Sequence, residues 1–119
     1  MQIAKTDLPD RTKLYARRVI RLVSALPKST VEQVLGKQVL RSGTSVGANY
    51  REASRARSRA EFVAKMGDCL KELSESQYWL ELFSEEKVIP PEKLAPLLSE
   101  TRELTAIFVS SIKTARSRV

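Results

Sequence analysis

The sequence predicts an all-α protein, an antiparallel up-down-up-down four-helix bundle. Two observations support this prediction. Apolar residues recur at spacings of three and four along the chain, with no alternating strand pattern, and helix-breaking signals fall at only three places. A length of 119 residues is typical of one domain, here 1–119, whose core needs neither disulfide nor metal. We expect helices near 8–26, 30–54, 58–85 and 91–116.

The first two helices are predicted from an apolar stripe each and from the signals between them. The first stripe, which Pro27 ends, consists of Tyr15, Val19, Leu22, Val23 and Leu26. Ser29 stands three residues before Glu32, the spacing of a capping box, in which each side chain accepts a bond from the other residue's backbone N–H. The second stripe then consists of Val31, Val34, Leu35, Val39 and Val46.

The third helix is predicted after a turn at Ser54–Arg57, because Ser58 and Glu61 repeat the capping-box spacing. Its core stripe consists of Phe62, Met66, Cys69, Leu70, Leu73, Leu80 and Phe83. Three further apolar residues, Tyr78, Trp79 and Leu82, lie on another side of the same helix. They predict contact with a second layer of the fold or with another subunit.

The fourth helix is predicted to begin at Pro91, because the first helical position has no use for a backbone N–H. Its buried side is expected to consist of Leu94, Leu97, Leu98, Thr101, Leu104, Thr105, Phe108, Ser111 and Ile112. Cations in its last turns, among them Lys113 and Arg116, complement the helix dipole.

Two glycines four residues apart, Gly43 and Gly47, are unusual within a bundle helix. Each costs about 1 kcal/mol relative to Ala, so close approach of another backbone would offset the cost. The contact could be made within the chain or with another subunit. The alternative is a moderately strained helix with no further role.

A polar stripe follows one face of the second helix and faces two carboxylates of the third. Inside a bundle such groups must satisfy one another, so we predict a structural network of Gln38, Arg41, Asn49, Glu52, Glu72 and Glu75. Paired carboxylates also occur in di-iron bundles, but those sites use Glu-x-x-His ligands. The chain has no His, so we expect no metal and no cofactor.

Composition also limits the chemistry and the compartment. Without His there is no Ser-His or Cys-His pair, and Cys69 is the only cysteine. We therefore expect no catalytic residues and no enzymatic activity. Met1–Pro9 is short and polar, and no segment is long and apolar enough to span a membrane. These features predict a cytoplasmic protein.

Basic residues are concentrated in the first half of the chain. The formal net charge is +7, and residues 1–60 hold 13 basic and 4 acidic side chains, a net +9. One cluster, Arg51, Arg55, Arg57 and Arg59, spans the turn between the second and third helices. A second group on the first helix consists of Arg11, Lys13, Arg17, Arg18 and Arg21. Both predict contacts with nucleic-acid phosphates, the alternative being solubility and ion pairs between subunits.

The segment Leu40–Phe83, LRSGTSVGANYREASRARSRAEFVAKMGDCLKELSESQYWLELF, resembles the bacterial four-helix bundle proteins encoded by intervening sequences of 23S ribosomal RNA genes. The likeness is carried by Gln38, Arg41, Ser45-Val46, Asn49, Glu52, Ser58 to Phe62, Glu72, Glu75 and Tyr78-Trp79-Leu80. Where the family has Glu-Gly, this chain has Glu52-Ala53.

The resemblance implies an antiparallel bundle without an assigned enzymatic activity. Relatives include the accessory protein of diversity-generating retroelements, a basic five-membered ring that binds nucleic acid and a reverse transcriptase. It also implies that Asn49, Glu52 and Glu72 join an internal network and that Trp79 is an interface or core anchor. We thus expect a homo-oligomer, a pentamer, that binds RNA or DNA. The alternative is a scaffold for a protein partner such as a nucleic-acid enzyme, without direct nucleic-acid binding.

Overall fold

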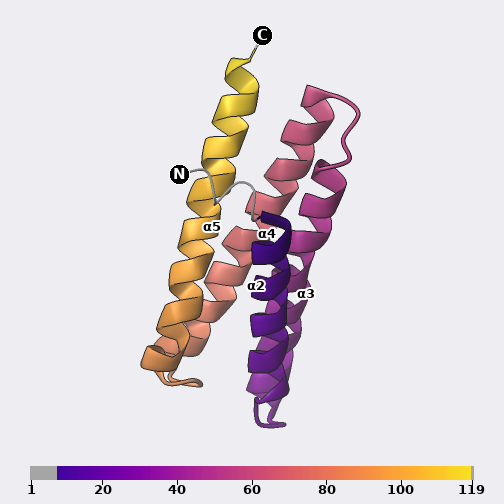
Figure 1. Ribbon diagram of the computed structural model, residues 1–119. Coiled ribbons are helices and arrows are strands. Elements are labelled where there is room, and N and C mark those ends of the chain that lie inside the picture. Colours follow the sequence, from indigo (N-terminus) through magenta and orange to yellow (C-terminus); the bar gives the residue numbers. More distant parts are fainter. Residues whose placement is uncertain (1–7, 119) are drawn as a thin grey trace.

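Each predicted apolar stripe, apart from Leu26 at the end of the first, lies on one helix of an antiparallel four-helix bundle (Figure 1). The computed structural model describes residues 8–118. Its helices are α2 (Leu8–Ser24), α3 (Thr30–Ala53), α4 (Arg59–Glu85) and α5 (Pro91–Ser117). The predicted fold class is therefore confirmed. Residues 1–7 and 119 lie outside the described residues. They include most of the segment for which we expected no export signal, Met1–Pro9, and both ends of the expected domain.

The observed helix ends lie within two residues of the predicted ones. The first helix ends at Ser24 rather than at 26, and Leu26 continues as a turn in which its N–H donates to the Val23 carbonyl at 3.1 Å. Pro91 occupies the start of α5 as predicted. Within residues 8–118, none of the helices is long and apolar enough to cross a bilayer.

The two predicted capping boxes differ in the structure. Ser29 is the N-cap of α3, but its side chain makes no capping bond. The side-chain amide of Gln33 donates to the Pro27 carbonyl at 3.0 Å in the same connection. The prediction of a capping box at Ser29 and Glu32 is therefore wrong. At α4 the Ser58 hydroxyl accepts from the Glu61 N–H at 3.0 Å. The Glu61 carboxylate accepts from Arg57 rather than from Ser58.

The core contains large apolar side chains and a few hydroxyls that bond to one another. Tyr15, Phe83 and Phe108 are fully buried. The Tyr15 hydroxyl lies 2.7 Å from Thr101 Oγ1, which donates to the Leu97 carbonyl at 2.8 Å. These bonds satisfy the hydroxyls that the α2–α5 contact buries.

The glycines of α3 allow α2 to pack closely against it. A Cβ on Gly43 would lie 2.8 Å from Cγ2 of Val19, and one on Gly47 would lie 3.2 Å from Oγ1 of Thr12. Both contacts are made within the chain, so the structure assigns these glycines to packing of α2 on α3. Gly67 of α4, in contrast, has no such neighbour within 4 Å.

The bundle measures 51 × 26 × 20 Å, and α2 is its shortest helix. Figure 1 shows α2 beginning about halfway along α4 and α5 and running antiparallel to α3. The first turns of α2 therefore lie beside the last turns of α3. This arrangement brings together two basic segments that are far apart in the sequence.

Candidate nucleic-acid interface

Most of the predicted phosphate-binding cations are not used in ion pairs. Among residues 8–118, the pairs involve Arg11 with Glu100 and Glu103, Arg41 with Glu72 and Glu75, and Lys65 with Glu52. In that part of the chain no carboxylate lies within 4.0 Å of the remaining arginines of the prediction, which are Arg17, Arg18, Arg21, Arg51, Arg55, Arg57 and Arg59. All are exposed except Arg18, which is half-buried.

Arg11 does not belong to the basic surface that the sequence predicted for the first helix. Its Nη2 lies 2.7 Å from Glu100 Oε1 and 3.0 Å from Glu103 Oε1, so it ties α2 to α5. The hydrogen bond to Glu100 raises the pKa of the guanidinium. Arg11 is therefore a structural cation.

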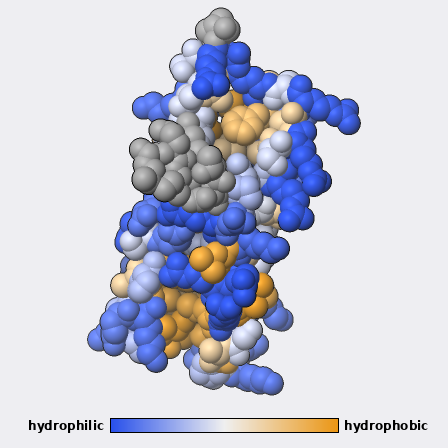
Figure 2. All heavy atoms as spheres, in the orientation of Figure 1, coloured by the Kyte–Doolittle hydropathy of each residue, from blue (hydrophilic) through white to orange (hydrophobic). Residues whose placement is uncertain are grey.

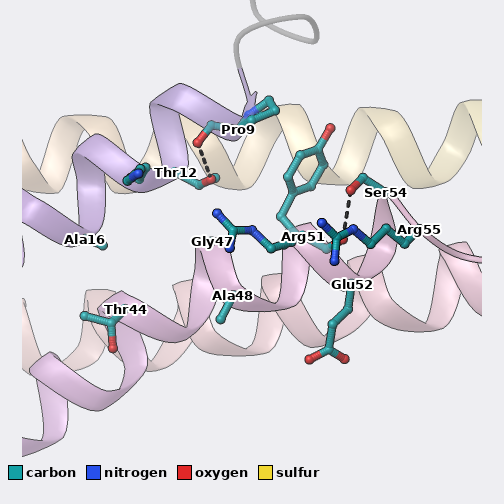
Figure 3. Close-up of a pocket in the computed structure, with 12 residues that line it drawn as sticks. Pro9, Thr12, Ala16, Thr44, Gly47, Ala48, Arg51, Glu52, Ser54 and Arg55 are labelled. Carbon is teal, nitrogen blue, oxygen red and sulfur yellow. Dashed lines mark hydrogen bonds between the residues drawn. The ribbon is translucent and has the colours of Figure 1, made fainter.

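A groove between α2 and α3 collects three of the unpaired cations (Figure 3). This α2–α3 groove has a volume of about 540 Å³ and is lined by Lys13, Arg51 and Arg55 together with Pro9, Thr12, Ala16, Thr44, Gly47, Ala48, Tyr50, Glu52 and Ser54. In Figure 3 the Arg51 and Arg55 side chains extend in the same direction along the groove. Three positively charged side chains thus line one concave surface.

Glu52 is the only carboxylate lining the described groove, and its charge is directed elsewhere. Its Oε1 lies 2.7 Å from Lys65 Nζ of α4, and Figure 3 shows the carboxylate pointing away from α2. That hydrogen bond raises the pKa of Lys65. The groove therefore keeps a net positive charge.

The basic surface extends from the groove along both helices. Arg17 and Arg21 follow Lys13 at intervals of four, so all three lie on one face of α2. Arg57 and Arg59 lie beyond the groove, at the turn into α4. Figure 2 shows hydrophilic side chains covering most of the face seen there, with an apolar area toward its lower end.

The predicted polar network is found in part, at the edge of the α3–α4 contact. Arg41 is half-exposed and pairs with Glu75 and Glu72. Its Nη1 lies 3.2 Å from Glu72 Oε1 and donates to Glu72 Oε2 at 3.4 Å, whereas Glu72 Oε1 is buried and accepts no hydrogen bond. The pairing of Arg41 with the two carboxylates of α4 agrees with the prediction, but these groups lie at the edge of the bundle rather than in its interior. Glu52 pairs separately with Lys65, and the described contacts include no side-chain hydrogen bond for Gln38 or Asn49.

The predicted interface residues of α4 have different environments. Tyr78 is 55% exposed, and its ring meets that of Trp79 edge to face, with centroids 5.1 Å apart. Trp79 and Leu82 are half-buried, and Trp79 packs against the core of its own chain. Trp79 Nε1 is buried and has no hydrogen-bond acceptor among the described residues.

The groove also contains residues that sequence reasoning did not assign to a site. Thr44, Ala48 and Tyr50 line it, and Tyr50 is half-buried against Phe108, with ring centroids 5.8 Å apart. Burial raises the pKa of Tyr50. The spacing of Gly43 and Gly47 was the available signal, since it marked the face of α3 on which another helix packs.

Neither the core thiol nor the carboxylates form a second candidate site. Cys69 is buried, and burial raises its pKa to about 12. Among residues 8–118, no three His, Cys, Asp or Glu side chains are grouped so as to hold a metal ion.

Comparison with known proteins gives two matches of wide extent. The family model described as 23S rRNA-intervening sequence protein matches residues 5–110. The second match is the crystal structure of a protein of unknown function from the S23 ribosomal protein family of Bacteroides thetaiotaomicron VPI-5482. Its sequence is 40% identical to this one, and the two structures superimpose with a TM-score of 0.84 over 89% of this chain and 98% of that chain. No curated protein is significantly similar to the sequence.

Proposed function

Because the chain belongs to the 23S rRNA-intervening sequence protein family, we propose that it is a non-enzymatic homo-oligomer that binds RNA or DNA through its basic surface. The bound groups are phosphates rather than base edges. The oligomer is a pentameric ring of four-helix bundles, and it holds no cofactor.

The observation that carries this proposal is the division between paired and unpaired cations. Arg11, Arg41 and Lys65 form ion pairs within the chain, whereas Arg51, Arg55, Arg57 and Arg59 have no such partner among the described residues. An arginine fork binds a phosphate through two parallel hydrogen bonds. Such contacts release counterions and carry no sequence information. Binding should therefore weaken steeply with salt and show little sequence preference.

The outer face of α3 and α4 supports the oligomer part of the proposal. Ser42 Oγ lies 2.8 Å from Ser76 Oγ, so antiparallel pairing places Val34 of α3 near the level of Phe83 and Ser84 of α4, less than two helical turns from Tyr78. Val31 and Val34 are 55% and 54% exposed, much like Tyr78. Apolar residues grouped on one exposed face are typical of subunit contacts.

The first experiment is a mass measurement by light scattering, with and without labelled generic RNA and DNA at 50 and 200 mM NaCl. We expect a ring whose mass increases with nucleic acid at the lower salt concentration only. A ring whose mass does not change with either nucleic acid would contradict nucleic-acid binding. The mass of a monomer would contradict the proposed oligomer.

Charge reversal tests which residues bind. Arg55→Glu with Arg57→Glu should lower the affinity for single-stranded RNA and reduce the slope of log K against log salt by about 1.4, since each lost phosphate contact removes about 0.7. Titration by fluorescence anisotropy at several salt concentrations measures both. The matched control is Lys93→Glu with Arg102→Glu on α5. It makes the same charge change and should affect the affinity and the salt slope less. An unchanged slope would remove these arginines from the interface.

The alternative function is a protein-interaction scaffold in which these arginines pair with carboxylates of a neighbouring subunit. The acidic character of α4, which carries six acidic and three basic residues, is the observation that favours it. Under this alternative the reversal at Arg55 and Arg57 should dissociate the oligomer. Under the proposed function its mass should be unchanged.

A further inference from the structure

The lining of the α2–α3 groove combines cations with small residues, Ala16, Gly47 and Ala48. Three of its hydroxyls donate to backbone carbonyls: Thr12 to Leu8 and Thr44 to Leu40, each at 2.7 Å, and Ser54 to Arg51 at 2.8 Å. Directional recognition from the groove therefore comes mainly from its cations.

The shape and charge of the groove define a class of ligand. Lys13, Arg51 and Arg55 would hold an anionic group, and Arg forks are suited to phosphate in particular. The small lining residues beside them leave space for an uncharged body attached to that phosphate. A volume of about 540 Å³ lies within the usual range of small-molecule sites, about 300 to 1,000 Å³.

We propose that the α2–α3 groove seats one unstacked nucleotide of the bound strand, with its phosphate between Lys13, Arg51 and Arg55 and its sugar and base over Ala16, Gly47 and Ala48. This inference rests on the proposed function and assigns a specific site to it. The remaining arginines, including Arg17, Arg21, Arg57 and Arg59, contact the backbone on either side.

The groove makes the protein selective for single strands. A nucleotide in the interior of a duplex is stacked and paired, and removing it from the helix breaks both interactions. A nucleotide of a flexible single strand pays much less. Arginines on an open surface, in contrast, bind the backbone of a duplex as readily as that of a single strand.

The test uses a variant that fills the groove without changing the charge. Ala48 is exposed on α3, and Leu has nearly the same helix propensity as Ala, so Ala48→Leu should fold normally. The matched control is Ala106→Leu at an exposed position of α5. The probes are fluorescein-labelled 12-mers of oligo(U) and oligo(dT) and a 12-base-pair duplex, each in 50 mM NaCl.

We expect Ala48→Leu to weaken binding of both single strands by about tenfold and to leave duplex binding unchanged. The control Ala106→Leu should bind all three probes as the wild type does. A second pair is matched in charge. Arg51→Gln with Arg55→Gln should reduce single-strand affinity several-fold more than Arg57→Gln with Arg59→Gln. The two single-stranded probes distinguish RNA from DNA as the preferred ligand.

The failures of the two proposals are distinguishable. If the wild-type protein binds none of the probes, the proposed function fails and the groove proposal with it. If the wild type binds them but Ala48→Leu behaves like Ala106→Leu, or the two arginine pairs lose equal affinity, only the groove assignment is overturned.

Discussion

At the scale of single residues, burial decides what each polar group can do. The Tyr15 ring is fully buried, as its place in the first apolar stripe predicts, and its hydroxyl bonds to Thr101. Burial raises its pKa. Tyr50, only half-buried, is the aromatic residue that reaches the α2–α3 groove. The two tyrosines carry the same side chain, and their surroundings separate a core residue from a surface one.

Cys69 provides a residue-scale prediction. Its thiol is buried and lies 3.6 Å from the Val46 carbonyl, and burial raises its pKa to about 12 from a usual value of about 8.5. Only the thiolate reacts, so at pH 8 the native protein should react with a thiol reagent about a thousandfold more slowly than the protein in concentrated urea. Absorbance after addition of Ellman's reagent measures both rates. Equal rates would show that Cys69 is accessible in the fold.

The same pKa shift predicts how stability changes with pH. The folded state retains its thiol proton where the unfolded state has lost it, between about pH 8.5 and 12. The contribution of Cys69 is therefore fully present below that range and is lost as the pH rises through it. Urea denaturation of the wild type and Cys69→Ala at pH 8 and 10 checks this. The stability lost between the two pH values should be smaller in the variant.

At the scale of the elements, the contact between α2 and α3 positions the candidate site. Gly43 and Gly47 bring the two helices close together, with Val19 and Thr12 against the bare Cα atoms. Close packing at these points sets the register that places Lys13 beside the end of α3. The groove therefore depends on the two glycines that let α2 approach α3.

The glycines provide an element-scale prediction with a built-in control. Gly43→Ala would place a Cβ against the stiff, fully buried Val19, and overpacking of this kind costs about 1–3 kcal/mol. Gly67→Ala meets nothing within 4 Å and should increase the free energy of unfolding by about 0.5–1 kcal/mol through helix propensity. Urea denaturation at one protein concentration compares them. Equal stability of the two variants would contradict the close approach.

At the scale of the whole molecule, the exposed apolar residues of α3 and α4 lie apart from the α2–α3 groove, while α2 carries Leu14 and Ile20 exposed among its cations. The unpaired cations follow α2 and the end of α3, whereas Val31, Val34 and Tyr78 lie exposed along α3 and α4. A ring assembled through the second face would leave the first one free. Nucleic-acid binding and assembly should therefore respond to different substitutions.

Tyr78 tests this separation. Because its side chain is 55% exposed, Tyr78→Arg should leave the bundle folded but place a charge in the subunit contact and reduce the mass measured by light scattering. The control is Val109→Arg on α5, where a 43% exposed side chain lies away from that face and the mass should not change. Circular dichroism verifies that both variants are helical. If Tyr78→Arg retains the wild-type mass, Tyr78 does not belong to the interface.

The sequence by itself determined the helices, their order and the fold class. Periodic apolar residues and helix breakers are local signals, so the predicted ends agree with the observed ones to within one or two residues. The pairing of Arg41 with carboxylates of α4 followed from the same spacing. Local signals did not decide every contact at the helix ends, however: the Ser29 side chain makes no capping bond, and the Gln33 side chain donates to the Pro27 carbonyl there.

Only the tertiary structure decided which charged residues are available. Arg11 and Lys13 stand two positions apart, yet Arg11 pairs with Glu100, 89 residues away, while Lys13 lines the groove. The polar stripe from Gln38 to Glu52 likewise proved to lie at the surface edge of α3 and α4. Helical periodicity says which residues share a face but not which neighbour that face meets. The choice of neighbour is made by long-range packing, which is why the groove appears only in the folded chain.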